Sequence, residues 1–284
     1  TTARRWKPGN IDLAALLCNI ATFLRRYVVL TEHQQRALTL WIAHTYAIDA
    51  ADCTPYIILR SAEKRSGKTL LLEVLSLLVP RAWLTGRVTP AVLVRKISGI
   101  NPTLLLDETD ATFNGNKEFS ETLRGVLNSG YRRGGVYSIC VPEKGEWIYK
   151  DFLVFGPKAL AGIGNLPDTV QDRGIPIEMR RKLKTEEAEK FRRRKVVQDA
   201  IPLADALATW AYEAVLILEV TEPGIPEKLN DRAADVWEPL LAIADMAGGE
   251  WPTWARQSAI ALSGDSGQED ESLGVTLLKD IQTV

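Results

Sequence analysis

The sequence is poor in the residues that build disulfide frameworks and zinc sites. Its 284 residues include three cysteines and two histidines, with no CxxC spacing and with the histidines far apart. We therefore expect neither a disulfide framework nor a structural zinc centre. The sequence also lacks an excess of either charge, since 35 basic and 36 acidic residues give a net charge of −1. Any attraction to a polyanion must therefore come from a local basic patch.

Long hydrophobic runs and targeting signals are missing as well. The longest nearly apolar run, residues 69–79, is interrupted by Glu73. This run is shorter than the roughly 20 residues that a membrane span needs. The N-terminus does not resemble a signal peptide, and the chain begins at Thr1 without a methionine. We therefore expect a cytoplasmic protein, and we expect this chain to be a fragment of a longer one.

Short apolar segments alternate with amphipathic helical patterns along the first two thirds of the chain. Buried strands are expected at 56–59, 83–84, 103–107, 152–155, 158–163 and 175–179. Helices are expected at 11–26, from 31 onward, and at 69–79, 89–99 and 117–130, with a β-hairpin over 136–149. The alternation predicts an α/β fold with a largely parallel sheet that is flanked by helices.

After Arg180 the strand pattern ends, and helices are expected at 203–220 and 231–246. The intervening residues 180–195 contain nine basic residues against three acidic ones. This run has two interpretations, and the sequence leaves both open. It is either a solvated helix with charge pairs such as Glu186–Lys190, or a surface that contacts DNA.

A phosphate-binding motif lies between the first expected strand and the helix at 69–79. Residues 61–69 read SAEKRSGKT, and a strand-to-helix loop of this kind brings backbone N–H groups towards an anion. The residues expected to hold the phosphates are Ser66, Gly67 and Lys68. Thr69 would bind Mg²⁺ through its hydroxyl. Ala62 replaces the first glycine of the usual pattern GxxxxGK[ST], which leaves the conformation at the start of the loop open.

Two adjacent acidic residues follow the strand at 103–107. Asp107 would complete the Mg²⁺ site with Thr69, and Glu108 would polarise the attacking water. An acid pair at this position favours hydrolysis of ATP over transfer of its phosphate to a small molecule. The two motifs together predict a P-loop ATPase with ATP and Mg²⁺ as its cofactors.

With these motifs placed, the chain resembles the AAA+ superfamily of P-loop ATPases. More closely, it resembles a helicase-like domain, formerly of unknown function, in primase and replication proteins of phages, plasmids and integrated elements. The segments that carry the resemblance read SAEKRSGKT, LLLDETD, VFGPKALAGIGNLPDTVQDRGIPIEM and LNDRAADVWEPLLAIADMAGGEWPTWAR.

The sequence patterns and the resemblance together divide the chain into four expected parts. An N-terminal helical segment, residues 1–54, would pack on a nucleotide-binding α/β core, residues 55–180, which contains the hairpin as an insertion. A small all-helical lid would follow at 181–263. Residues 264–284 would be a linker and the start of a truncated further element.

The resemblance also implies roles for single residues around the nucleotide. Asn165 would position the attacking water, and Arg173 would be the arginine finger that reaches the nucleotide of a neighbouring subunit. Arg232 would be the lid arginine that contacts the nucleotide. Each has an alternative interpretation. Asn165 could be a turn residue, Arg173 could pair with Asp172 or Asp168, and Arg232 could form a helix-surface ion pair with Asp235 or Asp231.

Three further basic residues are candidates for binding DNA. Lys144 lies at the expected tip of the hairpin, where the resemblance implies a lysine that tracks the DNA backbone. Arg132 and Arg133 precede the hairpin and would add phosphate contacts. A solvated turn residue is the alternative for Lys144.

These observations lead to the expectation of an ATP-hydrolysing motor. It would act on single-stranded DNA as a helicase or translocase in the replication of a phage, plasmid or integrated mobile element. It would form a homo-oligomer, a hexameric ring, and would work beside a primase or another replication protein. One alternative is a nucleotide-dependent oligomeric switch that recruits replication partners without unwinding. Another is a scaffold that binds nucleotide without turnover, which the intact motif residues disfavour.

Overall fold

A parallel sheet forms the centre of the computed structural model, which describes residues 11–63, 65–86, 88–107, 117–143, 145–162 and 166–263. Its strands are β1 (Tyr56–Arg60), β2 (Ala82–Thr85), β3 (Thr103–Leu106), β6 (Lys158–Ala161) and β7 (Gly174–Glu178). They lie in the order β2-β3-β6-β1-β7, and each neighbouring pair is parallel. The sheet confirms the expected α/β fold.

The strands of the sheet centre are apolar because both faces of the sheet are covered. All four residues of β3 and of β6 are buried, as are the first four of β1. The helices that connect the strands are α3 (Lys68–Leu75), α4 (Pro90–Ile100), α6 (Lys117–Ser129) and α7 (Asp168–Gln171). Helix α4 begins as expected, with Thr89 as N-cap and Pro90 in the first turn.

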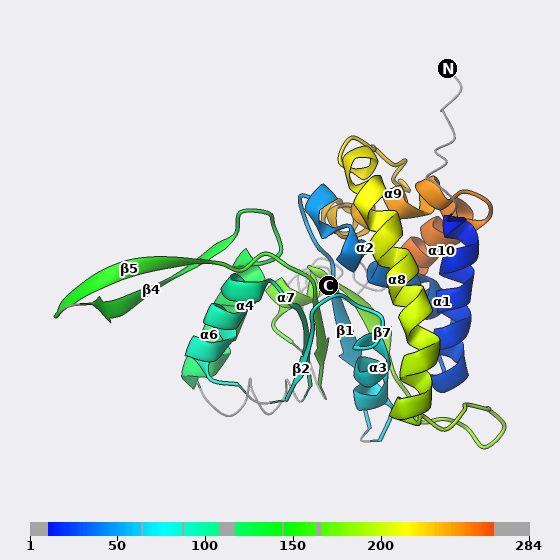
Figure 1. Ribbon diagram of the computed structural model, residues 1–284, viewed down its shortest axis with the longest axis horizontal. Helices are drawn as coiled ribbons and strands as arrows, with labels where there is room; N and C mark the ends of the chain where they lie inside the picture. Colours follow the sequence, from blue (N-terminus) through cyan, green and yellow to red (C-terminus); the bar gives the residue numbers. More distant parts are fainter. Residues whose placement is uncertain are drawn as a thin grey trace, which may run out of the picture.

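A layer of helices packs beside the sheet, next to β7 (Figure 1). It consists of α1 (Leu13–Tyr27), α2 (Glu32–Tyr46), the short 3₁₀ helix η1 (Ile48–Ala50), α8 (Arg193–Leu218), α9 (Asp231–Ala247) and α10 (Trp251–Ser263). Four tryptophans are fully buried in this layer or at its edge: Trp41, Trp210, Trp237 and Trp251. Helices from before β1 and from after β7 thus share one apolar interior.

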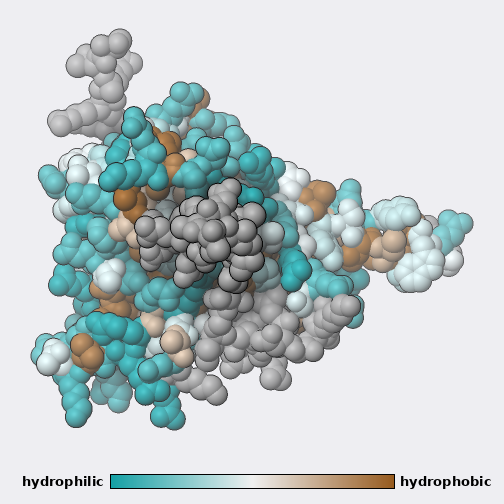
Figure 2. All heavy atoms as spheres, turned by 180° about the vertical axis from the view of Figure 1, so that it is seen from behind, coloured by the Kyte–Doolittle hydropathy of each residue, from teal (hydrophilic) through white to brown (hydrophobic). Residues whose placement is uncertain are grey.

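The β-hairpin projects away from the body of the molecule (Figures 1 and 2). It pairs β4 (Val136–Glu143) with β5 (Glu146–Leu153), and it is therefore longer than the expected span of 136–149. The separate strand expected at 152–155 is not formed, because Phe152 and Leu153 complete β5. Only one face of the hairpin packs on helices, so Phe152 is buried and Leu153 is 61% exposed.

The segment after β7 also differs from its expected form. Residues 180–192 are mostly non-helical, and α8 begins at Arg193, ten residues before the expected start. Pro202 lies inside α8. The interpretation of residues 180–195 as a solvated helix with a Glu186–Lys190 pair is wrong, because Glu186 instead pairs with Arg180.

Helix α8 is longer than the expected helix at 203–220, and its length makes it apolar over a longer stretch. By length and composition alone, α8 is the one helix among the described residues that could cross a membrane. Its inner residues Leu207, Trp210 and Ala214 are buried against the other helices of the layer. One face of α8 therefore packs on the layer, while Tyr212 and Leu216 of the same helix are exposed.

Candidate functional site

The loop between β1 and α3 has the backbone conformation that an anion site requires at its last residue. Gly67 is the N-cap of α3 and has a φ of 90°. A Cβ atom at Gly67 would lie 3.6 Å from Met179 Cε, which is an ordinary van der Waals distance. Glycine is therefore needed for its backbone conformation and not for lack of space. Arg65 also has a positive φ, 63°. Turns of this kind, followed by a helix N-terminus, direct N–H groups into one concavity.

The side chain of Lys68 lies over this loop. Its Nζ donates to Ser61 Oγ and, at 3.4 Å, to Ser66 Oγ. Both serines are buried, and Ser61 Oγ in turn donates to the Glu63 carbonyl at 2.8 Å. These two hydrogen bonds hold the ammonium group of Lys68 over the loop that precedes the N-terminus of α3. Ser61 was not among the expected site residues.

The start of α3 connects the loop to the strand-end acid. Thr69 Oγ1 donates to Asp107 Oδ2 at 2.7 Å. Strands β1 and β3 are separated by β6, so their ends are about 10 Å apart. Thr69 spans this gap because it stands at the beginning of the helix that follows β1. The structure therefore brings together Lys68, Thr69 and Asp107, as expected from the order of the two motifs.

The paired oxygens of Thr69 and Asp107 fit a hard cation such as Mg²⁺. Magnesium bound with a nucleotide needs only one or two protein oxygens, because phosphates and water fill the other positions. Within the described part of the chain, no group of three or more histidine, cysteine, aspartate or glutamate residues is suited to hold a metal ion by itself. The site fits a metal that arrives with an anionic ligand.

Three of the expected site residues lie outside the described residues. They are Glu108, which follows Asp107, Asn165, which follows β6, and Lys144, which lies between β4 and β5. The carboxyl ends of the parallel strands β1, β3 and β6 meet at one edge of the sheet, where ligands bind in open α/β folds. The candidate site thus lies at the edge that this topology favours.

Arg232 pairs with the residue that precedes Arg173 in the chain. Arg173 Nη1 donates to the Thr169 carbonyl, and its guanidinium carbon is 5.9 Å from the centre of the Tyr131 ring. Arg232, from α9, forms an ion pair with Asp172. Among the described residues, no ion pair joins Arg173 to Asp172 or Asp168, and none joins Arg232 to Asp231 or Asp235. No described contact joins either arginine to residues 61–69.

A contact that the sequence did not reveal connects α7 with the end of β1. Arg60 Nη2 donates to Gln171 Oε1, and Gln171 Nε2 donates to the Leu166 carbonyl at 2.5 Å. Arg60 immediately precedes the phosphate loop, and Gln171 immediately precedes Asp172. The segment that carries Asp172 and Arg173 is thereby connected to the strand that leads into the phosphate loop.

Arg132 and Arg133 have different surroundings. Arg132 pairs with Asp235 of α9 at 3.2 Å, and its side chain is 73% exposed. Arg133 donates to the carbonyls of η1 and of the chain that follows it, including Ile48 at 3.3 Å and Ala51 at 2.9 Å. Arg133 therefore anchors the chain that leads to β1, which leaves Arg132 as the more accessible candidate for a phosphate contact.

The segment after β7 passes directly beside the phosphate loop. Arg181 Nε pairs with Glu63 Oε2 at 2.9 Å, and the Met179 N–H donates to the Arg60 carbonyl at 2.7 Å. The sequence contains no local signal for these contacts, because their partners are more than a hundred residues apart.

Comparison with known proteins finds one family match and one similar curated protein. Residues 178–284 match a family described as "Protein of unknown function (DUF3631)". Over 106 residues the chain is 42% identical to an "Uncharacterized 28.9 kDa protein in xis 5'region" of Saccharopolyspora erythraea. This match covers 37% of the chain and 40% of that protein, so the chain spans less than half the length of its curated relative. The family match begins at the end of β7 and leaves the phosphate loop outside it.

Proposed function

We propose that this chain is a cytoplasmic AAA+ type P-loop ATPase that drives a DNA helicase or translocase. The observation that carries the proposal is the hydrogen bond from Thr69 to Asp107. This contact joins a Gly-Lys-Thr helix start to an acid at the end of a second parallel strand. A chance Gly-Lys-Thr sequence would not be expected to face a strand-end carboxylate in this way.

The residues of the site have distinct roles in this proposal. The N–H groups at Ser66 and Gly67 and the ammonium group of Lys68 bind the β- and γ-phosphates. Thr69 and Asp107 hold Mg²⁺, which when bound neutralises developing charge on the phosphate oxygens. Lys68 would exchange its hydrogen bonds to Ser61 and Ser66 for bonds to phosphate oxygens.

Two residues outside the described part complete the chemistry in the proposal. Glu108 accepts a proton from the attacking water, and Asn165 orients that water. Arg173 acts on the γ-phosphate bound by a neighbouring subunit, while Arg232 belongs to the helical layer and responds to the nucleotide within the same subunit. Arg232 pairs with Asp172, which directly precedes Arg173, and this pair supports a shared role of the two arginines.

Use of the ATPase on DNA rests on the resemblance to replication helicases and on the projecting hairpin. The hairpin carries Lys144 in its turn, and Arg132 lies near its base. The proposed assembly is a homo-oligomeric ring around single-stranded DNA, in the replication of a phage, plasmid or integrated mobile element. A partner primase or other replication protein belongs to the same proposal.

The proposal is tested by measuring ATP hydrolysis with and without single-stranded DNA. Wild-type protein should hydrolyse ATP in a Mg²⁺-dependent reaction, and Lys68→Ala should lose turnover. Lys96→Ala serves as a matched control, because Lys96 stands on α4 over the Trp83 ring. Equal activity of Lys68→Ala and wild type would refute the phosphate-loop assignment. Hydrolysis without strand separation would favour the alternative function of an oligomeric switch that recruits replication partners.

A further inference from the structure

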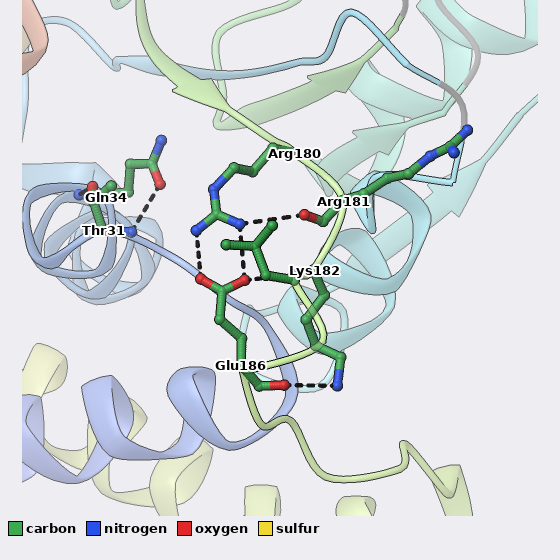
Figure 3. A network of polar contacts seen from close by, with 7 residues as sticks. Thr31, Gln34, Arg180, Arg181, Lys182 and Glu186 are labelled. Carbon is green, nitrogen blue, oxygen red and sulfur yellow. Dashed lines mark hydrogen bonds and ion pairs between the residues drawn. The ribbon is translucent and has the colours of Figure 1, made fainter.

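The basic segment, defined as residues 180–195, has a fixed conformation on the surface. Arg180 forms a bidentate ion pair with Glu186, and Lys182 Nζ donates to the Glu186 carbonyl at 2.9 Å (Figure 3). The guanidinium group of Arg180 lowers the pKa of Glu186 to about 2. The loop is therefore closed by a contact that persists at neutral pH.

The basic segment is also anchored to α1 at its far end. Arg26 pairs with Glu189 at 3.0 Å and with Asp199 at 3.1 Å. The Glu189 N–H donates to the Arg26 carbonyl at 2.7 Å, and the Phe191 ring meets the Tyr27 ring edge-on at 5.8 Å. These contacts bind two of the three acidic side chains of the segment to arginines.

Six cations of the basic segment remain exposed and without a side-chain hydrogen bond or ion pair to any other residue that the structure describes. They are Lys184, Lys190 and residues 192–195. Four of them stand in a row at the start of α8, where no acidic residue occupies the first turn and no side chain caps the helix. In Figure 2 this region lies at lower left and is largely hydrophilic.

The distribution of charge over the chain makes this patch stand out. The whole chain carries a net charge of −1, while the basic segment alone carries +6, so the rest of the chain carries −7. A polyanion would be repelled by most of the surface and attracted to this segment. A row of unpaired lysines and arginines fits evenly spaced phosphates better than it fits a single small anion.

We infer that the basic segment binds the phosphate backbone of nucleic acid. The inference rests on the proposed function for its choice of polyanion, and it adds a surface next to the phosphate loop, reached through the Arg181–Glu63 pair. Nucleic acid bound there would contact the segment that pairs with Glu63 of this loop. DNA binding and nucleotide binding would then influence each other.

The test compares two triple variants that remove the same charge. Arg192→Gln, Arg193→Gln and Arg194→Gln are combined in one protein. Arg95→Gln, Arg124→Gln and Lys228→Gln, all exposed and distant in sequence, are combined in the control. Binding of a fluorescent single-stranded oligothymidylate of 30 nucleotides is measured without nucleotide across a salt series.

The inference predicts that the first variant binds at least about tenfold more weakly at 0.1 M salt. The slope of log K against log salt should fall by about 0.7 for each lost phosphate contact, hence by about 2. The control should keep the wild-type slope. Equal slopes for wild type and the first variant, or an equal loss in the control, would overturn the inference.

Two further measurements separate this inference from its rivals. Any binding to vesicles that contain phosphatidylserine should be competed away by the oligonucleotide. Vesicle binding that the oligonucleotide cannot compete away would overturn the inference in favour of a membrane. Circular dichroism should show α8 intact in the variant. Because DNA binding is measured without ATP, loss of binding in the first variant supports the inference even where the chain hydrolyses no ATP.

Discussion

At the scale of single residues, the candidate site depends on one backbone angle and one hydroxyl group. Gly67 adopts the left-handed conformation that starts α3, and Thr69 Oγ1 reaches Asp107 across the intervening strand. Residues with a Cβ atom rarely adopt such an angle, so the glycine determines how the helix N-terminus meets the loop. Thr69 determines where a cation would lie.

The role of the Thr69 hydroxyl leads to a prediction about metal dependence. Thr69→Val keeps the shape of the side chain but removes the oxygen, and Thr69→Ser keeps the oxygen. We expect Thr69→Val to lose the gain in ATP affinity that Mg²⁺ provides, while Thr69→Ser retains most of it. Calorimetric titration with ATP, in Mg²⁺ and in EDTA, measures this gain. A Val variant with wild-type Mg²⁺ dependence would exclude Thr69 as a ligand.

At the scale of elements, the base of the projecting hairpin is fastened by a buried lysine at the start of β6. Lys158 is 1% exposed, and its Nζ donates to the carbonyls of Val154 at 3.0 Å and Gly156 at 2.7 Å. It also reaches the Gly130 carbonyl at 3.4 Å, at the end of α6. Burial lowers the pKa of Lys158 to about 7. One side chain thus joins α6, the hairpin and the sheet.

This arrangement predicts a large loss of stability when the lysine is removed. Lys158→Met keeps the volume but leaves buried carbonyls without a donor, at a cost of about 1–3 kcal/mol for each unsatisfied group. We expect the free energy of unfolding, measured in urea, to fall by about 3 kcal/mol. Lys150→Met on exposed β5 is the control and should change it by less than about 0.5 kcal/mol. A fall no larger than that of the control would mean that the carbonyls find other partners.

At the scale of the whole molecule, the helical layer and the sheet meet at residues that matter for the proposed function. Arg232 of α9 pairs with Asp172 beside Arg173, and Arg132 pairs with Asp235 of the same helix. Helices α1 and α2 pack with α8, α9 and α10 and form one layer beside the sheet (Figure 1). In the proposed function, a change in the bound nucleotide would reach this layer through the Arg232–Asp172 pair.

The proposed ring leads to a prediction about complementation. If Arg173 acts on the nucleotide of a neighbouring subunit, Arg173→Ala should bind ATP normally but hydrolyse it about 10³-fold more slowly or worse. Mixing it with Lys68→Ala should restore part of the turnover, since an intact Lys68 can then meet an intact Arg173. ATPase assays on the two variants and their mixture, at concentrations where the protein sediments as an oligomer, measure this. An inactive mixture of folded, oligomeric variants would rule out Arg173 as the finger.

The buried histidine of α2 gives the stability of the molecule a predictable pH dependence. His44 Nε2 lies 2.9 Å from Thr54 Oγ1, and burial lowers the pKa of His44 to about 3. The unfolded chain takes up a proton near pH 6.5, whereas the folded chain does so only near pH 3. The unfolded state therefore binds more protons in this range, and stability falls as the pH decreases through it.

From this difference we expect the free energy of unfolding to fall by about 2 kcal/mol between pH 7 and pH 5 because of His44 alone. His44→Gln keeps a polar side chain but cannot take up the proton, so most of this decrease should disappear. Urea unfolding at several pH values in this range measures the difference. The same pH dependence in the variant would assign the effect to other groups.

The local elements of this protein could be predicted from its sequence. The capping box that Thr31 forms with Gln34, the Thr89–Pro90 helix start and the largely apolar strands β1, β3 and β6 follow from residues close together in the chain. The parallel α/β sheet follows from their alternation with helices. Lys68 and Asp107 could be proposed as partners because each follows a buried strand, and parallel strand ends meet at one edge.

Only the tertiary structure decided which distant residues meet. The Arg181–Glu63 pair, the Arg60–Gln171 contact and the Arg232–Asp172 pair join segments that no local pattern relates. The fold likewise decided that residues 180–192 form a loop, held by the Arg180–Glu186 ion pair, although their spacing suited a helix. Helical spacing places charges four residues apart near each other, but a bidentate arginine pair and anchors on α1 stabilise the loop instead. Sequence periodicity indicates which residues are neighbours within one element. The partners in these contacts are instead determined by how distant elements pack in the tertiary structure.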